Sequence, residues 1–141
     1  MAVDAATGYR RPRLGSTSET ERALAGLTTH VLDVTRGGPA KGVRIELFEL
    51  EANGARRLVT TAATNADGRT DPPLIGAAEA RVGRFELVFH AGDYFRAQGA
   101  KLADPPFLDV VPVRFAVADA DAHYHVPLIV SPWSYSTYRG S

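Results

Sequence analysis

Short runs of alternating apolar and polar residues, interrupted by Gly, Pro and Asp, make up most of this chain. In residues 43–50 (VRIELFEL) an apolar side chain recurs at every second position, and residues 83–91 (GRFELVFHA) repeat the pattern. A period of two places successive side chains on opposite faces of a strand, so that one face is buried and the other meets water. The alternation therefore predicts a protein made mainly of half-buried antiparallel strands.

The number and spacing of these runs predict a β-sandwich. Further strand-like segments are found at residues 27–35, 56–64, 109–119 and 123–131. Strands at intervals of roughly 8–12 residues, separated by turn signals, are typical of two packed sheets. Residues 92–99 (GDYFRAQG) predict one short helix, with Asp93 as its N-cap and Gly99 just beyond its end. The expected fold class is all-β, a sandwich of two antiparallel sheets with one short helix.

The chain has 141 residues, a length typical of one domain. Residues 1–25 show no apolar alternation, and we expect a disordered leader there, followed by a single domain over residues 26–141. Paired arginines in YRRPR (9–13) could open an export signal, but no apolar stretch follows them. We therefore expect a cytoplasmic protein, and no apolar run approaches the about 18 residues of a membrane span.

The balance of positive and negative charge indicates which classes of binding partner to expect. Lys and Arg together number 16, as do Asp and Glu, so the formal net charge is zero. Nucleic-acid binding requires a basic stripe, and none is visible, whereas a near-zero charge is compatible with self-association. The absence of cysteine excludes disulfides and thiolate metal sites. We expect neither a nucleic-acid nor a membrane partner.

The four histidines are the most suggestive polar residues: His30, His90, His123 and His125. His123 and His125 flank a single residue, so in a strand both project from one face. The spacing allows three interpretations: structural rings bonded to the backbone, a zinc triad completed by His30, or general acid–base catalysis with water. No carboxylate lies immediately beside these histidines to orient their rings, as one often does in a zinc site, and this counts against a metal.

Arg69 and Ser141 are weaker candidates when considered alone. Arg69 follows Asp-Gly in a loop, where an arginine is usually a solvated charge but can also hold an anion or a polarised carbonyl. The last residues are SPWSYSTYRGS (131–141). A terminal Gly-Ser pair is often a cloning remnant, and the alternative is that these residues belong to a site.

Four segments in order resemble one family: LTTHVLDVTRGGPAKGV (27–43), TNADGRTD (64–71), FELVFHAGDYF (85–95) and HYHVPLIVSPWSYSTYRGS (123–141). Over about residues 26–141 the chain resembles the transthyretin-like 5-hydroxyisourate hydrolases of urate breakdown. The terminal YRGS separates these hydrolases from transthyretin, the hormone carrier. The resemblance implies the transthyretin-like form of the sandwich.

The resemblance also implies the site residues. The His of HVLD is His30, the Arg of DGR is Arg69, and the second His of HYH is His125. The implied catalytic residues are His30, Arg69, His125 and Ser141. The implied substrate-binding residues are His123, Tyr138, Arg139 and Gly140. Neither a metal nor a cofactor is implied.

The reaction implied is hydrolysis of 5-hydroxyisourate to 2-oxo-4-hydroxy-4-carboxy-5-ureidoimidazoline, by attack of water on the ring lactam carbonyl. His125 is slightly preferred over His30 as the general base. The family assembles as a homotetramer, a dimer of dimers, with active sites where sheet faces of two subunits meet. Three alternatives stay open: a transthyretin-type binding protein without catalysis, a zinc-dependent hydrolase, and a purely structural sandwich.

Overall fold

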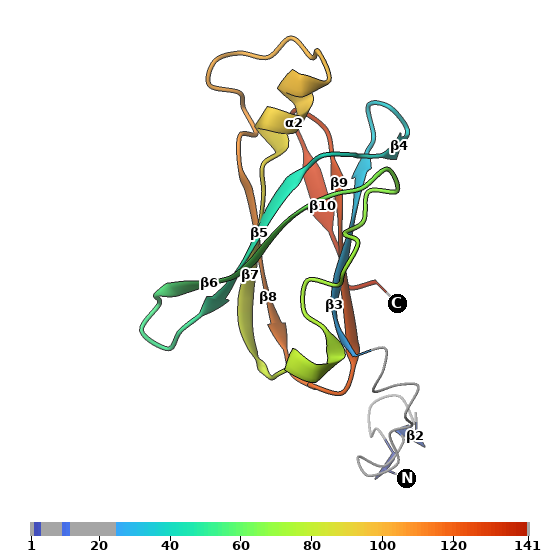
Figure 1. The fold of residues 1–141 in the computed structure, drawn as a ribbon, viewed down its shortest axis with the longest axis vertical. Coiled ribbons are helices and arrows are strands. Elements are labelled where there is room, and N and C mark those ends of the chain that lie inside the picture. The colour runs from blue at the N-terminus through green and yellow to red at the C-terminus, as the bar shows by residue number, and fades with distance from the viewer. Residues whose placement is uncertain (1, 4–9, 12–24, 141) are drawn as a thin grey trace.

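The computed structural model describes residues 2–3, 10–11 and 25–140 (Figure 1). Its strands are β1 (Ala2–Val3), β2 (Arg10–Arg11), β3 (Gly26–Asp33), β4 (Gly38–Pro39), β5 (Arg44–Leu50), β6 (Arg56–Ala63), β7 (Gly83–Phe89), β8 (Val111–Val117), β9 (His123–Val130) and β10 (Tyr135–Thr137). Its helices are the 3₁₀-helix η2 (Ala77–Glu79) and the α-helix α2 (Ala91–Ala97). β1 and β2 form a short antiparallel pair. Most of the predicted leader, and Ser141, lie outside the described residues.

Two four-stranded sheets face each other across the core (Figure 1). One has the order β6-β5-β7-β8 and is antiparallel throughout. The other has the order β10-β9-β3-β4, and its central pair, β3 and β9, runs parallel. The predicted two-sheet sandwich with a short helix is confirmed. One of its sheets is mixed, because β3 and β9 are joined through the whole of the other sheet and no hairpin fixes their relative direction.

The core lies between the sheets and follows the predicted alternation. Ile45 and Leu47 on β5 and Phe85, Leu87 and Phe89 on β7 are fully buried. The opposite sheet contributes the apolar side chains of β3 and β9 that face inward. Because these positions alternate with polar ones, the same two strands present a second row of side chains on the outer face of their sheet.

The helix α2 caps one end of the sandwich (Figure 1) and buries Tyr94 and Phe95. Its N-cap is His90 and not Asp93, so that prediction is wrong; Asp93 lies within the first turn. The reason is that β7 runs directly into the helix, with the N–H of His90 still bonded to the carbonyl of Arg44. Gly99 has a φ of +85°, as expected just past a helix end.

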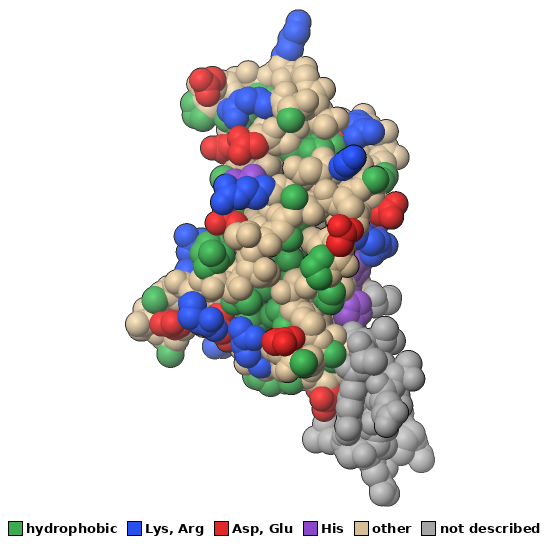
Figure 2. Space-filling view, viewed as in Figure 1, with side chains coloured by type: hydrophobic (Ala, Val, Ile, Leu, Met, Phe, Trp, Pro, Cys, Tyr) green, Lys and Arg blue, Asp and Glu red, His purple; other side chains and the backbone are tan. Residues whose placement is uncertain are grey.

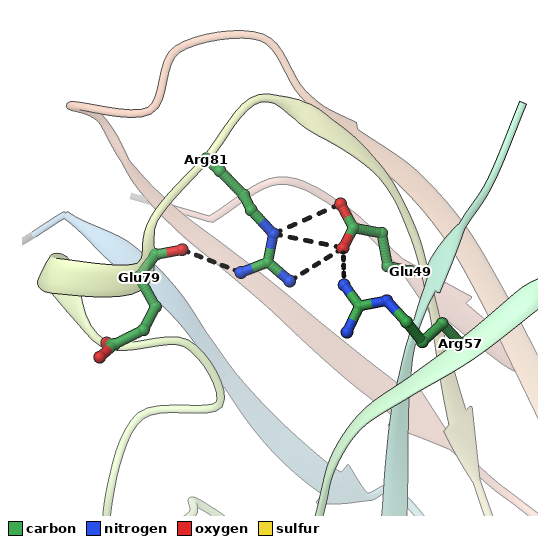
Figure 3. Close-up of polar contacts among 4 residues, drawn as sticks. All are labelled: Glu49, Arg57, Glu79 and Arg81. Carbon is green, nitrogen blue, oxygen red and sulfur yellow. Dashed lines mark hydrogen bonds and ion pairs between the residues drawn. The ribbon is translucent and has the colours of Figure 1, made fainter.

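A cluster of ion pairs fastens the connection around η2 to the β5–β6 hairpin (Figure 3). Arg81 donates to the Glu49 carboxylate at 2.9 Å and to the carbonyl oxygen of Glu79 at 3.0 Å, while Arg57 donates to Glu49 from the other side. The Arg81 hydrogen bond is the main cause that lowers the pKa of Glu49. The cluster ties the segment between β6 and β7 to the hairpin at the edge of their sheet.

Acidic and basic side chains are interspersed among the described residues on the face shown in Figure 2. In the described ranges, neither helix is both long and apolar enough to cross a bilayer.

Candidate active site

The outer face of the β3–β9 pair gathers the predicted histidines. Thr28 and His30 on β3, and His123 and His125 on β9, are half-buried and alternate with buried core residues. The parallel register sets Thr28 opposite His125 and His30 opposite Pro127. The two strands therefore bring three imidazoles from opposite ends of the chain onto one surface, as predicted for His123 and His125.

Thr28 lies between two of these rings. Its hydroxyl oxygen is 2.8 Å from His123 Nε2 and 2.8 Å from His125 Nδ1. The two rings are nearly parallel, with centroids 6.2 Å apart. Thr28 is not among the site residues that the sequence predicts. The available signal was its position two residues before His30, which places both side chains on the same face of a strand.

A tight turn carries Arg69 to the same face. Gly68 accepts a hydrogen bond from the N–H of Val31 at 2.8 Å, which docks the turn onto β3. Gly68 has a φ of +75°, and a Cβ there would lie 2.4 Å from the Val31 carbonyl oxygen and 3.2 Å from His30 Cδ2. Only glycine permits this approach. The exposed side chain of Arg69 therefore starts next to a residue that contacts the His30 ring.

The end of the chain covers His125. The N–H of Gly140 donates to the carbonyl of His125 at 2.8 Å. A Cβ on Gly140 would lie 2.6 Å from His125 Cδ2, so the backbone there rests directly on the imidazole. Gly140, predicted to bind substrate, thus contacts the predicted base. Its neighbour Ser141, predicted to be catalytic, lies outside the described residues.

Tyr138 and Arg139 lie elsewhere in the single chain. The Arg139 guanidinium lies 4.1 Å from the centroid of the Tyr124 ring and donates to the carbonyl of His123 at 3.4 Å. Tyr124 belongs to the buried face of β9, opposite to the histidines. Tyr138 and Arg139 line a pocket of about 210 Å³ at the sandwich edge between β8 and β10. Two of the predicted substrate-binding residues are therefore at the edge, while His123 and Gly140 adjoin His125.

The electrostatics of the face favour a neutral imidazole at His125. Partial burial removes water from the charged form and lowers the pKa of His125 below its usual range. The positive charge of Arg69 adds to this effect, and His123 and His30 contribute in the same direction. A neutral ring has a free lone pair and can accept a proton from water.

The fourth histidine belongs to the other sheet. His90 Nε2 lies 2.6 Å from Glu46 Oε1, and this hydrogen bond is the main cause that lowers the pKa of Glu46. His90 therefore has a structural partner away from the β3–β9 face. Among the described residues there is no group of three or more His, Cys, Asp or Glu side chains positioned to hold a metal ion.

Comparison with known proteins identifies the family. Residues 27–140 match the HIUase/Transthyretin family. The 5-hydroxyisourate hydrolase 2 of Rhizobium meliloti is 61% identical over 115 residues, which cover 82% of this chain and 95% of the relative. The structure of Klebsiella pneumoniae 5-hydroxyisourate hydrolase is 31% identical and covers 83% of this chain and 99% of its own, with a TM-score of 0.67.

A crystal structure of (S)-allantoin synthase is also similar, with a TM-score of 0.76 and 47% identity. It matches 82% of this chain, and this chain spans 43% of its length. The transthyretin-like form of the sandwich is thereby confirmed. The match of residues 27–140 and the 61% identity to a relative both point to one family, and the chain belongs to the HIUase/Transthyretin family.

Proposed function

We propose that this protein hydrolyses 5-hydroxyisourate to 2-oxo-4-hydroxy-4-carboxy-5-ureidoimidazoline, opening the six-membered ring at its lactam carbonyl. Relatives named as hydrolases of this substrate, among them one that is 61% identical and one that is 58% identical, support the assignment. The observation that carries it is the assembly of His30, His125 and the Arg69 turn on one sheet face, with the pKa of His125 lowered.

The proposed mechanism uses the two histidines in different roles. His125 accepts a proton from water as the water oxygen bonds to the carbonyl carbon. His30 orients that water or protonates the ring nitrogen as the carbon–nitrogen bond breaks. Arg69 holds the carbonyl oxygen and stabilises the negative charge that develops on it. The bond changes balance: the water oxygen ends in the new carboxyl group, and the ring nitrogen gains a proton as the carbon–nitrogen bond breaks. Where His30 supplies that proton, His125 gives up the proton it received and His30 regains one through solvent, which restores both rings.

The proposed closure of the pocket involves the end of the chain. Gly140 already rests on His125, and Ser141, which follows it, would place its hydroxyl near the substrate. Tyr138 and Arg139, at the sandwich edge, are close to an adjoining subunit in this proposal and would complete a site formed by more than one chain.

A homotetramer, arranged as a dimer of dimers, is the proposed assembly. The edge strands β8 and β10 flank the same pocket, and Trp133, Tyr135 and Tyr138 expose 67%, 44% and 56% of their surface. Exposed aromatic side chains beside open strand edges favour association with another chain. A second copy over the histidine face would turn it into a concave, drier pocket.

The test is a direct assay. Urate oxidase generates 5-hydroxyisourate from urate, and its ultraviolet absorbance reports its decay. We expect the protein to accelerate this decay, and to do so after exhaustive chelation. Unchanged decay would overturn the hydrolase proposal, and activity lost on chelation would favour a zinc-dependent hydrolase.

The alternative function is that of a small-ligand carrier, because the family includes transthyretin. A carrier would bind an aromatic ligand between subunits and leave the decay of 5-hydroxyisourate unchanged. The histidine face with its nearby arginine favours the hydrolase, since a carrier has no need for a neutral imidazole beside a cationic turn.

A further inference from the structure

Thr28 shares one hydroxyl group between two histidines. Its oxygen is within 2.8 Å of His123 Nε2 and of His125 Nδ1. A threonine hydroxyl has one proton to donate, and a neutral imidazole carries hydrogen on one nitrogen. Among the described residues the Thr28 hydroxyl makes no hydrogen bond other than these two. With both rings neutral and the hydroxyl proton used between them, the hydroxyl donates to one ring and accepts from the other.

The two possible arrangements have opposite consequences for His125. In the first, His125 Nδ1–H donates to Thr28 and the Thr28 hydroxyl donates to His123 Nε2. The lone pair of His125 is then on Nε2. In the second, His123 Nε2–H donates to Thr28 and the Thr28 hydroxyl donates to His125 Nδ1. The hydrogen of His125 is then on Nε2, and its lone pair, on Nδ1, already accepts from Thr28.

Only the first arrangement leaves a basic nitrogen free. Among residues 25–140, His125 Nε2 makes no hydrogen bond, while Nδ1 is held by Thr28. When Nε2 accepts a proton from water, the Nδ1–H bond to Thr28 persists unchanged. The first arrangement therefore serves the ring both before and after proton transfer, whereas the second leaves the ring no nitrogen with which to act.

Packing keeps the ring in this position. The Gly140 backbone lies against the Cδ2 edge of His125, and the nearby Thr29, on the opposite face of β3, bonds to the Val126 carbonyl at 2.7 Å. The hydrogen bonds that join His125, Thr28 and His123 are thus built on the paired strands β3 and β9 rather than on a loop. Rotation of the His125 ring away from Thr28 would bring it against the chain end.

We propose that Thr28 is a positioning residue that holds His125 in the tautomer with hydrogen on Nδ1, with His123 Nε2 as the acceptor of the Thr28 proton. This inference rests on the proposed hydrolase function and gives it a defined base. It also gives His123 an indirect role, in which it accepts the Thr28 hydrogen bond and does not touch the reacting atoms. Thr28 itself touches neither water nor substrate in this scheme.

The experiment compares Thr28→Val, which keeps the shape and removes the hydroxyl, with Thr28→Ser, which restores it. Thr61→Val is the control, since it removes a threonine hydroxyl from an exposed position on β6, in the other sheet. We expect kcat to fall roughly 10- to 100-fold in Thr28→Val with KM little changed, which is less than the loss of the whole about 10²–10⁴-fold contribution of acid–base catalysis, because the base itself remains. Thr28→Ser should recover most of the rate, and Thr61→Val should keep it.

Nitrogen-15 NMR of the histidine rings supplies a readout that is independent of activity. At about pH 8, where histidines are neutral, the wild-type His125 should carry hydrogen on Nδ1, and Thr28→Val should shift it toward Nε2. A wild-type His125 with hydrogen on Nε2, or a Thr28→Val protein with unchanged kcat, would overturn the inference. If the wild-type protein fails to hydrolyse 5-hydroxyisourate, the proposed function is lost, whereas the tautomer still reports on Thr28.

Discussion

His125 has a neighbour on nearly every side, and this makes it the most informative position in the chain. Its Nδ1 bonds to Thr28, its carbonyl accepts from Gly140, and its pKa is lowered by burial and by Arg69. Each contact comes from a different part of the sequence. The following expectations at the scale of single residues depend on these contacts.

Replacing His125 or His30 by alanine should lower turnover at least about a hundredfold, the lower range of general acid–base catalysis. Both variants should keep the fold, because both rings lie outside the core, and the assembly, because the exposed aromatic side chains proposed to favour association are unchanged. Turnover in the ultraviolet assay and the mass of the assembly are the two measurements. Near-normal rates in both variants would remove the histidines from the mechanism.

The pH dependence should report the lowered pKa of His125. Activity requires the neutral ring, so kcat/KM should fall on the acid side only below the usual histidine value of about 6.5. Arg69→Gln removes a positive charge that disfavours the imidazolium, and it should move this limb to higher pH. Arg69→Lys keeps the charge and should leave the limb in place. A limb that does not move in Arg69→Gln would contradict this coupling.

The same shift affects stability. A native state in which the pKa of His125 is lowered binds fewer protons than the unfolded chain. Its contribution to the free energy of unfolding is therefore present above about pH 6.5 and lost as the pH falls through the range between the two values.

Gly140→Ala should impair hydrolysis by moving the His125 ring. The added Cβ would be 2.6 Å from Cδ2, a contact that requires the ring or the chain end to shift and so disturbs the hydrogen bond between His125 and Thr28. We expect kcat to fall by about tenfold or more with little change in the melting temperature. Gly38→Ala is the control, because a Cβ there meets nothing within 4 Å. Equal activity of both variants would contradict the close packing.

At the scale of elements, the short strand β10 marks the boundary between residues that pair within the sheet and the following residues, which cover His125. Residues Tyr135–Thr137 pair with β9, and the turn before them is closed by Ser131, whose N–H donates to the Ser134 carbonyl at 2.8 Å. Removal of residues 138–141 leaves this pairing intact but uncovers His125. Hydrolysis should therefore fall far more than the melting temperature, as measured by the ultraviolet assay and by thermal unfolding. A truncated protein with full activity would exclude the chain end from the site.

The sequence predicted the longer strands because their apolar residues recur with a period of two. It did not predict β10, since three residues are too few to show a period. It also could not give the parallel direction of β3 and β9, because alternation is the same in either direction. The prediction of Asp93 as the helix N-cap is wrong, since nothing in the sequence shows that β7 continues hydrogen bonding through His90.

The candidate site was likewise predictable from the sequence only in part. The shared face of His123 and His125 follows from their spacing, while His30 and Arg69 were assigned by resemblance. The link through Thr28 depends on register between strands 97 residues apart, which local patterns do not contain. The position of Arg139 over Tyr124 likewise depends on how the chain end turns after β10.

For the whole molecule, the tetramer should be the active form. Tyr135→Lys would place a charge on the outer strand β10, where like charges would oppose the pairing of two copies. We expect sedimentation to show smaller assemblies and the ultraviolet assay to show reduced turnover per chain, with the strand content of each chain unchanged. Lys41→Glu, a charge change on an exposed loop, is the control. Full activity in a monomeric variant would exclude a shared site.

The parallel pairing of β3 and β9 also affects how the protein is made. During synthesis β3 leaves the ribosome early and must wait for almost the entire chain before its partner emerges. Contacts between such distant segments form late and slow the search for the native state. A nascent chain that stops anywhere before β9 therefore exposes the unpaired edge of β3 and contains neither His123 nor His125. Premature termination should yield an inactive product with an open strand edge, one that proteases and chaperones can distinguish from the finished enzyme.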